Sequence, residues 1–242
     1  MVLLGRTGNN MFQYALGRVL AAKHGVPLVL DGSWFGKKGW GEVSHFLRTP
    51  IHADVSRHPA FASRVLLKLT GKHYWEYTDI PVIRENESDH TFDPSILNAP
   101  ADCMIFGYFQ SPLYFESIEA EIREEFQAML AGANTANPDL RAELSAPNSV
   151  AIHVRRTDYT EIPAFAVCGS HYYSAAMDEM SMRIPGARFF IFSDDPEWCR
   201  SEFAGADRKV VSEAAGSRSP LEDMHLMSLA PHHIIANSTY SW

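Results

Sequence analysis

The clearest indication of the fold is the segment Val150-Ala-Ile-His-Val-Arg-Arg-Thr-Asp-Tyr159. The run from Val150 to Val154 is short and mostly apolar, which is typical of a strand buried on both faces. Two arginines follow this run directly. In open sheets of parallel strands, ligands bind beyond the carboxyl ends of the strands, so the residues after Val154 are the first candidates for a binding site.

The chain after this stretch alternates between strands and helices. We expect a helix over 172–182, a strand over 189–192, a helix from Pro196, a strand at 210–211, a helix from Pro220 and a strand over 234–236. Such alternation predicts an α/β fold in which helices cover a parallel sheet.

The start of the chain predicts a similar unit. Residues 1–4 indicate an apolar strand, the turn over 5–10 leads into a helix, and a second strand is expected over 26–30. Apolar side chains at helical spacing share one face of this helix: Phe12, Leu16, Val19 and Leu20. Gly25 and Pro27 are expected to end it.

Residues 31–102 mix glycine, histidine, proline and aromatic residues without sustained periodicity, apart from an apolar helical piece around Val65–Leu69. A buried strand is expected over 104–109, and a helix follows over about 118–126.

The segment 131–138 is small, polar and rich in turn-forming residues, so it predicts a boundary between two domains. We expect an amino-terminal domain over 1–132 and a carboxyl-terminal domain over 133–242. A chain of 242 residues, 46% of them hydrophobic, is long enough to build two small cores.

The composition excludes several classes of protein. A formal net charge of -8 disfavours binding to nucleic acid or to anionic lipid, because both would be repelled. The cysteines Cys103, Cys168 and Cys199 have the spacing of neither a disulfide framework nor a zinc site. Since no apolar run approaches the roughly 20 residues that span a bilayer, we expect a cytoplasmic protein. It could also associate transiently with the inner face of the membrane.

Arg155 and Arg156 are the leading candidates for chemistry. Two guanidiniums at a strand end can grip phosphate oxygens, because each presents a planar fork of donors that stays charged. Ion pairs with Asp158 or Glu161 would explain the same residues equally well. His153 lies at the end of the same strand.

Two further polar segments follow predicted strands. In Ser193-Asp194-Asp195-Pro196 one carboxylate is expected to cap the next helix, and the other could accept from a ribose or guanine, pair with an arginine, or belong to a metal site. Asn237, Ser238 and Ser241 follow the last strand, where a helix start could hold a phosphate. An ordinary cap would explain Asn237 or Ser238 too.

Read together, these segments resemble the family-11 glycosyltransferases, the alpha-1,2-fucosyltransferases. The opening Gly5-Arg-Thr-Gly-Asn-Asn-Met-Phe-Gln-Tyr14 is similar to the family's Gly-Gly-x-Gly-Asn-Gln-Met-Phe-Gln-Tyr. The other markers follow in order along the chain: Gly107-Tyr-Phe-Gln-Ser111, His153–Tyr159, Phe192–Asp195, Asp223–Ser228 and Ile235–Trp242.

The resemblance implies a GT-B fold, with two Rossmann-like domains facing a cleft, the first on the acceptor side and the second binding the donor. It implies an inverting transfer of fucose from GDP-fucose to a galactose-containing oligosaccharide, without a metal or other cofactor. It implies that Arg155 and Arg156 are catalytic and stabilise the departing diphosphate. Asp158, or alternatively Glu161, is close enough in the sequence to be the catalytic base. The implied donor-binding residues are Gly5, Gly8, Asn9, Asn10, His153, Ser193, Asp194, Asp195, Asn237, Ser238 and Ser241.

The sequence departs from the family's pattern at three positions, where Arg6 and Thr157 replace glycines and Asn10 replaces glutamine. The chain also ends at Trp242, inside a marker that continues in relatives, so we expect it to be incomplete there. These departures keep open a second hypothesis, a degenerate protein that binds a sugar nucleotide or glycan without catalysis.

A third hypothesis is a dinucleotide-dependent oxidoreductase. The order of strand, Gly5-to-Gly8 turn, helix, strand and Asp31 imitates a dinucleotide site. The glycine spacing differs from Gly-x-Gly-x-x-Gly, and no other segment indicates hydride chemistry.

Overall fold

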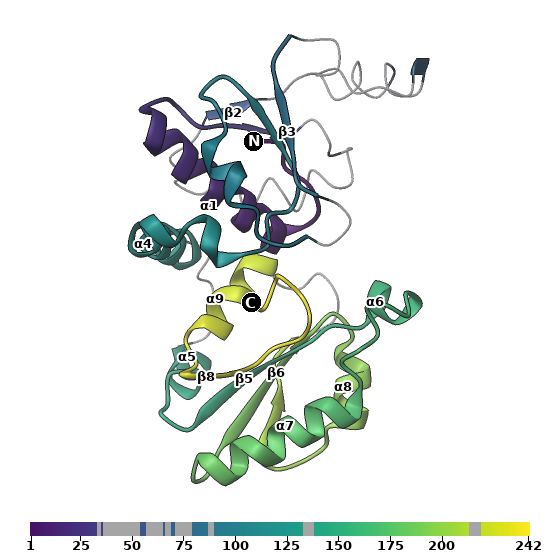
Figure 1. Cartoon of the computed structure of the whole chain (residues 1–242). Coiled ribbons are helices and arrows are strands. Elements are labelled where there is room, and N and C mark those ends of the chain that lie inside the picture. Colours follow the sequence, from purple (N-terminus) through teal and green to yellow (C-terminus); the bar gives the residue numbers. More distant parts are fainter. Residues whose placement is uncertain are drawn as a thin grey trace. The chain divides into compact units, whose positions relative to one another are not determined.

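The computed structural model describes residues 1–32, 35, 54–56, 65, 69–70, 79–86, 90–132, 138–212 and 219–242. The chain divides into two compact units, Met1–Met129 and Leu130–Trp242 (Figure 1). Every strand pairing among the described residues is parallel, which confirms the predicted mixed α/β class. None of the helices described there is long and apolar enough to cross a membrane.

The amino-terminal unit contains short strands and a long helix. Its elements are α1 (Thr7–His24), β1 (Val29–Asp31), β2 (Asp54–Ser56), β3 (Val82–Arg84), η2 (Pro94–Asn98), β4 (Met104–Phe106), η3 (Pro112–Tyr114), η4 (Glu116–Ile118) and α4 (Glu119–Ala131). The helical piece expected at Val65–Leu69 lies largely outside the described residues.

The segment 1–4 joins the two strand pairs of this unit. β1 pairs with β2, and β3 pairs with β4. Between them, the Val2 N–H donates to the Ile105 carbonyl at 2.9 Å, and the Leu3 N–H donates to the Asp31 carbonyl at 2.9 Å. The expected first strand is therefore an extended segment that is hydrogen-bonded on both sides, with a single parallel bridge at Val2.

Helix α1 is buried on more than the predicted face. Phe12, Leu16 and Leu20 are buried as expected, but Tyr14 on another side of the helix is fully buried too. The helix ends at Gly25, whose φ of 63° lies in the left-handed region that glycine adopts without strain. A helix covered this widely is a central element of its unit rather than an amphipathic helix at the surface.

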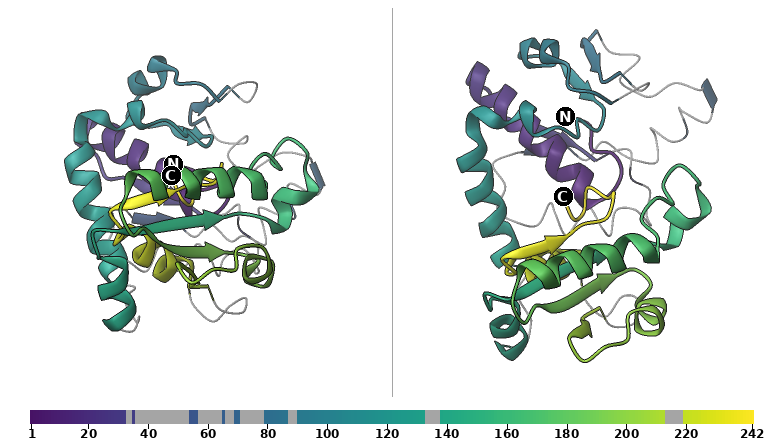
Figure 2. Two further views of the ribbon diagram at one scale, coloured as in Figure 1. Left: turned by 90° about the horizontal axis from the view of Figure 1, so that it is seen from below. Right: turned by 60° about the horizontal axis from the view of Figure 1, so that its bottom comes forward.

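The carboxyl-terminal unit is built around a sheet in the order β7-β6-β5-β8. Its elements are α5 (Pro138–Leu144), β5 (Ser149–Val154), α6 (Thr157–Glu161), α7 (Ser170–Arg183), β6 (Arg188–Ser193), α8 (Pro196–Glu202), β7 (Arg208–Val210), α9 (Pro220–Ser228) and β8 (His232–Ile234). The alternation of strands and helices was predicted, and Figure 2 shows α7 running alongside these strands.

The last two strands begin two residues before the predicted positions. The prediction followed the apolar residues, whereas β8 starts at the paired histidines, with His232 opposite Val150 in the ladder. Backbone pairing places these histidines in the strand whatever their side chains prefer. The short helices α5 and α6 were not predicted, because neither is long enough to show a helical period.

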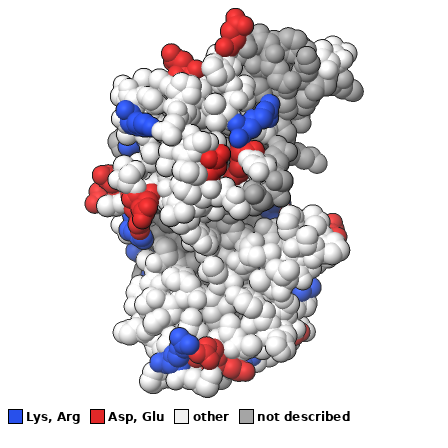
Figure 3. Space-filling view, in the orientation of Figure 1, with Lys and Arg blue, Asp and Glu red and all other residues white. Residues whose placement is uncertain are grey.

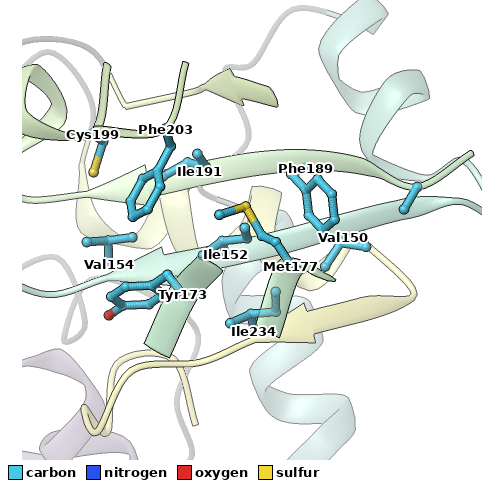
Figure 4. Close-up of a cluster of buried hydrophobic side chains, with 11 residues drawn as sticks. Val150, Ile152, Val154, Tyr173, Met177, Phe189, Ile191, Cys199, Phe203 and Ile234 are labelled. Atoms are coloured by element: carbon cyan, nitrogen blue, oxygen red, sulfur yellow. The ribbon is translucent and has the colours of Figure 1, made fainter. Parts of the chain in front are cut away.

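The core of this unit lies between one face of the sheet and helices α7 and α8 (Figure 4). Alternate residues of β5 and β6 point into it, which is the two-residue period of a strand. Its fully buried members include Val150, Ile152, Phe189 and Ile191. Each such side chain stabilises the fold by about 1.5–3 kcal/mol through burial.

The strand expected over 104–109 ends at Phe106, because the backbone turns at the next residue. Gly107 has a φ of 156° and Phe109 has a φ of 54°. A Cβ atom at Gly107 would lie 2.4 Å from the Cβ of Glu85 and 2.9 Å from the ring of Phe109. Glycine is therefore required here for space as well as for its backbone angle.

Replacing Gly107 by alanine should lower the free energy of unfolding by about 1–3 kcal/mol more than replacing Gly25, because only the former also overpacks its surroundings. Gly25→Ala is a matched control, since its φ is positive but nothing lies within 4 Å of the added Cβ. Urea unfolding of both variants measures the difference. Equal losses would show that the crowding at Gly107 has no energetic cost.

Candidate functional site

The carboxyl ends of β5, β6 and β8 meet at one edge of the sheet, because the three strands are parallel. The chain leaves β5 toward β6 and β7 and then returns to form β8 on the other side of β5. In open sheets, ligands usually bind beyond the carboxyl ends of the two strands at such a reversal. The residues after β5 and β8 lie at this edge of the sheet.

Arg155 is held by two carboxylates. One of its terminal nitrogens donates to Asp158, and the other lies 2.9 Å from an Oδ atom of Asp194. Its side chain is 12% exposed, and its guanidinium lies 5.2 Å from the ring centre of Tyr159. The ion pair with Asp158, which the sequence left as an alternative to phosphate binding, is present in the structure.

Arg156 is held differently, by a ring and a single carboxylate. Its Nε donates to Asp195 at 3.1 Å, and its guanidinium carbon lies 3.7 Å from the ring centre of Trp198. Stacking on an aromatic ring fixes the plane of a guanidinium. Among the described residues, no side chain or backbone group accepts a hydrogen bond from the two terminal nitrogens of Arg156.

Asp194 and Asp195 connect the ends of β5 and β6. Asp194 accepts from the Arg156 N–H at 2.9 Å and from the hydroxyl of Thr157. Asp195 caps α8 by accepting from the Trp198 N–H at 3.2 Å, with Pro196 in the first turn, as the sequence predicted. Both carboxylates thus face guanidiniums and N–H groups, which is the environment of an ion-pair partner rather than of a metal ligand.

Ser193 takes part in the same connection through its backbone and its hydroxyl. The Ser193 N–H donates to the hydroxyl of Ser212 at 3.0 Å, and that hydroxyl donates to Asp223 at 3.2 Å. The Ser193 hydroxyl accepts from the Asp195 N–H at 2.9 Å. Ser193 therefore stabilises the turn that carries Asp194 and Asp195.

His153 is buried near the carboxyl end of β5, on the opposite pleat from the core side chains drawn in Figure 4. Its ring centre lies 5.0 Å from that of Tyr240, and its Nδ1 has no hydrogen-bond partner among the described residues. Burial lowers the pKa of His153 from 6.5 to about 4; the charge of Asp194 opposes this shift, and that of Arg155 adds to it. The imidazole is therefore neutral at physiological pH.

The last segment of the chain forms bends and turns over 237–241 and does not start a helix there. Its polar side chains bond to nearby backbone. The Asn237 amide donates to the Phe165 carbonyl at 3.1 Å, the Ser238 hydroxyl accepts from the Tyr240 N–H at 3.3 Å, and the Ser241 hydroxyl donates to the Ser238 carbonyl at 3.2 Å. These bonds fold the segment back so that Tyr240 reaches His153.

The candidate residues near the amino terminus belong to the other unit. Helix α1 begins at Thr7, so Gly8, Asn9 and Asn10 lie in its first turn rather than in the preceding loop. Asn10 is fully buried, and its amide donates to the Leu4 carbonyl at 2.9 Å. Gly5 has a φ of 70°, and a Cβ there would collide with the amide of Asn9.

Charge around the two arginines is already compensated within the protein. Three carboxylates, those of Asp158, Asp194 and Asp195, pair with the two guanidiniums. The face shown in Figure 3 likewise carries acidic and basic side chains in small mixed groups. The site therefore holds its arginines in place rather than presenting a broad positive surface.

Sequence reasoning missed the aromatic partners of the site. Trp198 supports Arg156, Tyr159 lies beside Arg155, and Tyr240 lies beside His153. The spacing of Trp198 from its cap Asp195 was a usable signal, because the third residue after an N-cap lies in the first helical turn beside it. Tyr240 gave no comparable signal, since its position depends on the turns of the last segment.

The chain matches known proteins along nearly its whole length. The family model described as Glycosyl transferase family 11 matches residues 51–242. An alpha-1,2-colitosyltransferase from Escherichia coli is 28% identical, with the alignment covering 99% of this chain and 84% of the relative. The O-antigen biosynthesis glycosyltransferase WbnK from Escherichia coli is also 28% identical, covering 99% and 87%.

A galactoside alpha-(1,2)-fucosyltransferase 2 from Gorilla gorilla gorilla is 25% identical, covering 98% of this chain and 65% of the relative. No solved structure matches the chain significantly. The family model covers far more than half of the sequence and confirms the resemblance drawn from its motifs. The chain belongs to glycosyl transferase family 11.

Proposed function

We propose that this glycosyltransferase moves L-fucose from GDP-fucose to a hydroxyl of a galactoside with inversion at the anomeric carbon. The relative named for fucosyl transfer supports this sugar, whereas the one named for colitosyl transfer makes colitose the alternative. We propose a GT-B arrangement for the chain, with residues 1–132 on the acceptor side and residues 133–242 binding the donor. No metal is assigned a role, since Asp194 and Asp195 pair with arginines.

The proposal depends mainly on how the guanidinium of Arg156 is held. Arg156 is stacked on Trp198 and fixed by Asp195, while its terminal nitrogens have no partner among the described residues. A guanidinium held in one plane at the carboxyl edge of a parallel sheet can grip two oxygens of a diphosphate without breaking its existing ion pair. Arg155 can add a further contact only when it shares its nitrogens with Asp158 and Asp194.

The proposed reaction forms a bond from the acceptor oxygen to the anomeric carbon of fucose and breaks the bond from that carbon to the diphosphate. Negative charge grows on the leaving GDP as this bond breaks, and Arg156 neutralises it. Interactions that strengthen in the transition state are the ones that accelerate the reaction. Asp158 remains a candidate to accept the proton of the acceptor hydroxyl, although in the structure its carboxylate is engaged by Arg155.

His153 supplies a second group for the nucleotide. Its neutral ring is buried near the carboxyl end of β5, and its Nδ1 has no hydrogen-bond partner among the described residues. A buried polar atom without a partner is costly, and a bound nucleotide would satisfy it. We therefore retain His153 as a donor-binding residue.

The dinucleotide hypothesis finds less support. Gly8 lies inside α1 rather than in the turn that would have to cradle a pyrophosphate, and Asp31 is only 4% exposed. The non-catalytic hypothesis is separated from the enzyme by the products of the reaction.

Incubation of the protein with GDP-fucose and lactose should release GDP and yield a fucosylated trisaccharide, detected by mass spectrometry. A parallel reaction with GDP-colitose identifies the preferred sugar, because colitose is fucose without its 3-hydroxyl. Faster transfer of colitose would correct the donor and keep the reaction class. Donor binding without either product would support the degenerate protein instead.

Replacing Arg156 by alanine should lower kcat by about two to three powers of ten, because it removes a contact to charge that develops in the transition state. Arg188→Ala is the matched control, since Arg188 lies at the amino end of β6 and pairs with Glu143 on the surface. Steady-state rates with GDP-fucose measure both variants. A folded Arg156→Ala enzyme with the control's kcat would remove Arg156 from the mechanism.

Stability should fall as the pH is lowered from 7.5 to 5, because unfolded His153 takes up a proton below about pH 6.5 while the folded ring stays neutral down to about pH 4. This linkage amounts to about 2 kcal/mol over that interval. Urea unfolding at both pH values measures this loss of stability, which should be smaller by about this amount in His153→Gln. His171→Gln, at an exposed position of α7, should lose as much stability between the two pH values as the wild type. Equal losses in all three proteins would contradict the burial of a neutral ring.

A further inference from the structure

The loop that follows β4 carries an unusual backbone. Gly107 has a φ of 156°, and two residues later Phe109 has a φ of 54°. Glycine adopts such angles freely, but a left-handed aromatic residue costs about 1–2 kcal/mol. Phe109 is nevertheless fully buried, with its ring 5.6 Å from that of Tyr114. The surrounding structure therefore holds the loop in one conformation.

A buried carboxylate holds this loop. The side chain of Glu85, which follows β3, is 3% exposed. One of its oxygens accepts from the Tyr108 N–H at 2.7 Å, and the other accepts from the Phe109 N–H at 2.8 Å. His90 lies 3.2 Å from the first of these oxygens. Burying a carboxylate is expensive, and here both of its oxygens are used to fix two consecutive amides.

The same loop is tied to the segment 1–4 beside it in the sheet. The amide of Gln13 donates to the Gly107 carbonyl at 2.9 Å, while its oxygen accepts from the Leu4 N–H at 3.0 Å. Gln110, which is exposed, donates through its side-chain amide to the Asn9 side chain at 2.9 Å. Gln13 thereby links the end of the segment 1–4 to the residue that follows β4.

The locked loop presents a particular set of groups. Tyr108 is half-buried, and the exposed ring of His90 lies 6.0 Å from it at a steep angle. Gln110, at the end of the same loop, adds a side-chain amide that is hydrogen-bonded to the side chain of Asn9. A ring beside side-chain amides suits a neutral hexose, whose hydroxyls pair with amides and whose apolar face packs on an aromatic ring.

We propose that the Gly107–Gln110 loop, with Asn9, forms the binding site for the galactoside acceptor, and that Glu85 is the positioning residue that sets its shape. This inference rests on the proposed transferase function and assigns the acceptor to groups of the amino-terminal unit. Tyr108, Gln110 and Asn9 contact the sugar, so Asn9 is assigned to the acceptor rather than to the donor, as the family resemblance had implied. Glu85 acts through the two amides that it holds.

The test compares Glu85→Gln with the matched control Glu125→Gln. Glu125 is also a largely buried carboxylate of the same unit, but it pairs with Arg18 and Tyr14, away from the loop. The first substitution replaces an acceptor of one loop amide by a donor. The KM for lactose should rise about tenfold in Glu85→Gln, because one buried hydrogen bond becomes unsatisfied, while the KM for GDP-fucose stays constant. Glu125→Gln should keep both values.

Two further variants, one at the exposed Gln110 and one at the half-buried Tyr108, cover the case in which Glu85→Gln does not fold. Gln110→Ala and Tyr108→Ala should both weaken the binding of lactose, measured without donor by saturation-transfer NMR, and should leave the binding of GDP unchanged. Wild-type affinity for lactose in both variants would overturn the proposal. So would a loss of GDP binding, which would assign the loop to the donor.

Measuring lactose binding and sugar transfer separately distinguishes a failure of the acceptor site from a failure of the proposed function. If the wild-type protein binds lactose through these residues but transfers no sugar, the acceptor site stands and the transferase function fails. If transfer proceeds and the loop variants behave as wild type, the function stands and the acceptor site fails.

Discussion

The contacts of Asp194 determine the geometry of the whole candidate site. This carboxylate follows β6, and it accepts from the backbone of Arg156, from the hydroxyl of Thr157 and from the guanidinium of Arg155. It therefore fixes the path of the chain as it leaves β5. The adjacent Asp195 caps α8 and orients Arg156 against Trp198. The paired carboxylates convert two flexible side chains into a preorganised site.

This arrangement also explains why the two arginines differ. Arg155 is nearly buried and pairs with two carboxylates, so its charge is largely neutralised within the protein. Arg156 keeps its terminal nitrogens available among the described residues, and its stacking leaves one edge for a ligand. Thr157, one of the departures from the pattern that the sequence resembles, makes a hydroxyl contact to Asp194 that glycine could not make. The departure from the family pattern thus strengthens the connection between the strands.

Much of the carboxyl-terminal unit could be predicted from its sequence. Each strand there is an apolar run followed by polar residues, and parallel pairing brings these polar residues to one edge. The contact of Arg155 and Arg156 with Asp194 and Asp195 follows from that rule. Trp198 and Tyr240 could not be placed as partners, because their positions depend on side-chain packing and on turns. The predicted position of β8 was two residues too late, because the histidines at its start gave no apolar signal.

The amino-terminal unit was less predictable for a related reason. Its strands are three residues long in β1, β3 and β4, too short for a two-residue period to be distinguished. Glu85 lies in a region without periodicity, and only the structure shows that it holds a loop more than twenty residues away in sequence. The role of Asn10 was likewise hidden, since a buried amide that supports backbone has the same sequence signal as one that binds a ligand.

The most direct test of a diphosphate site at the carboxyl edge of this sheet is calorimetric titration of the intact protein with GDP and with guanosine. Charge-assisted hydrogen bonds to the phosphates should make GDP bind about tenfold or more tightly than guanosine, and added salt should reduce this advantage. Equal affinities for the two ligands, or no heat with either, would contradict the assignment of Arg156 to the donor.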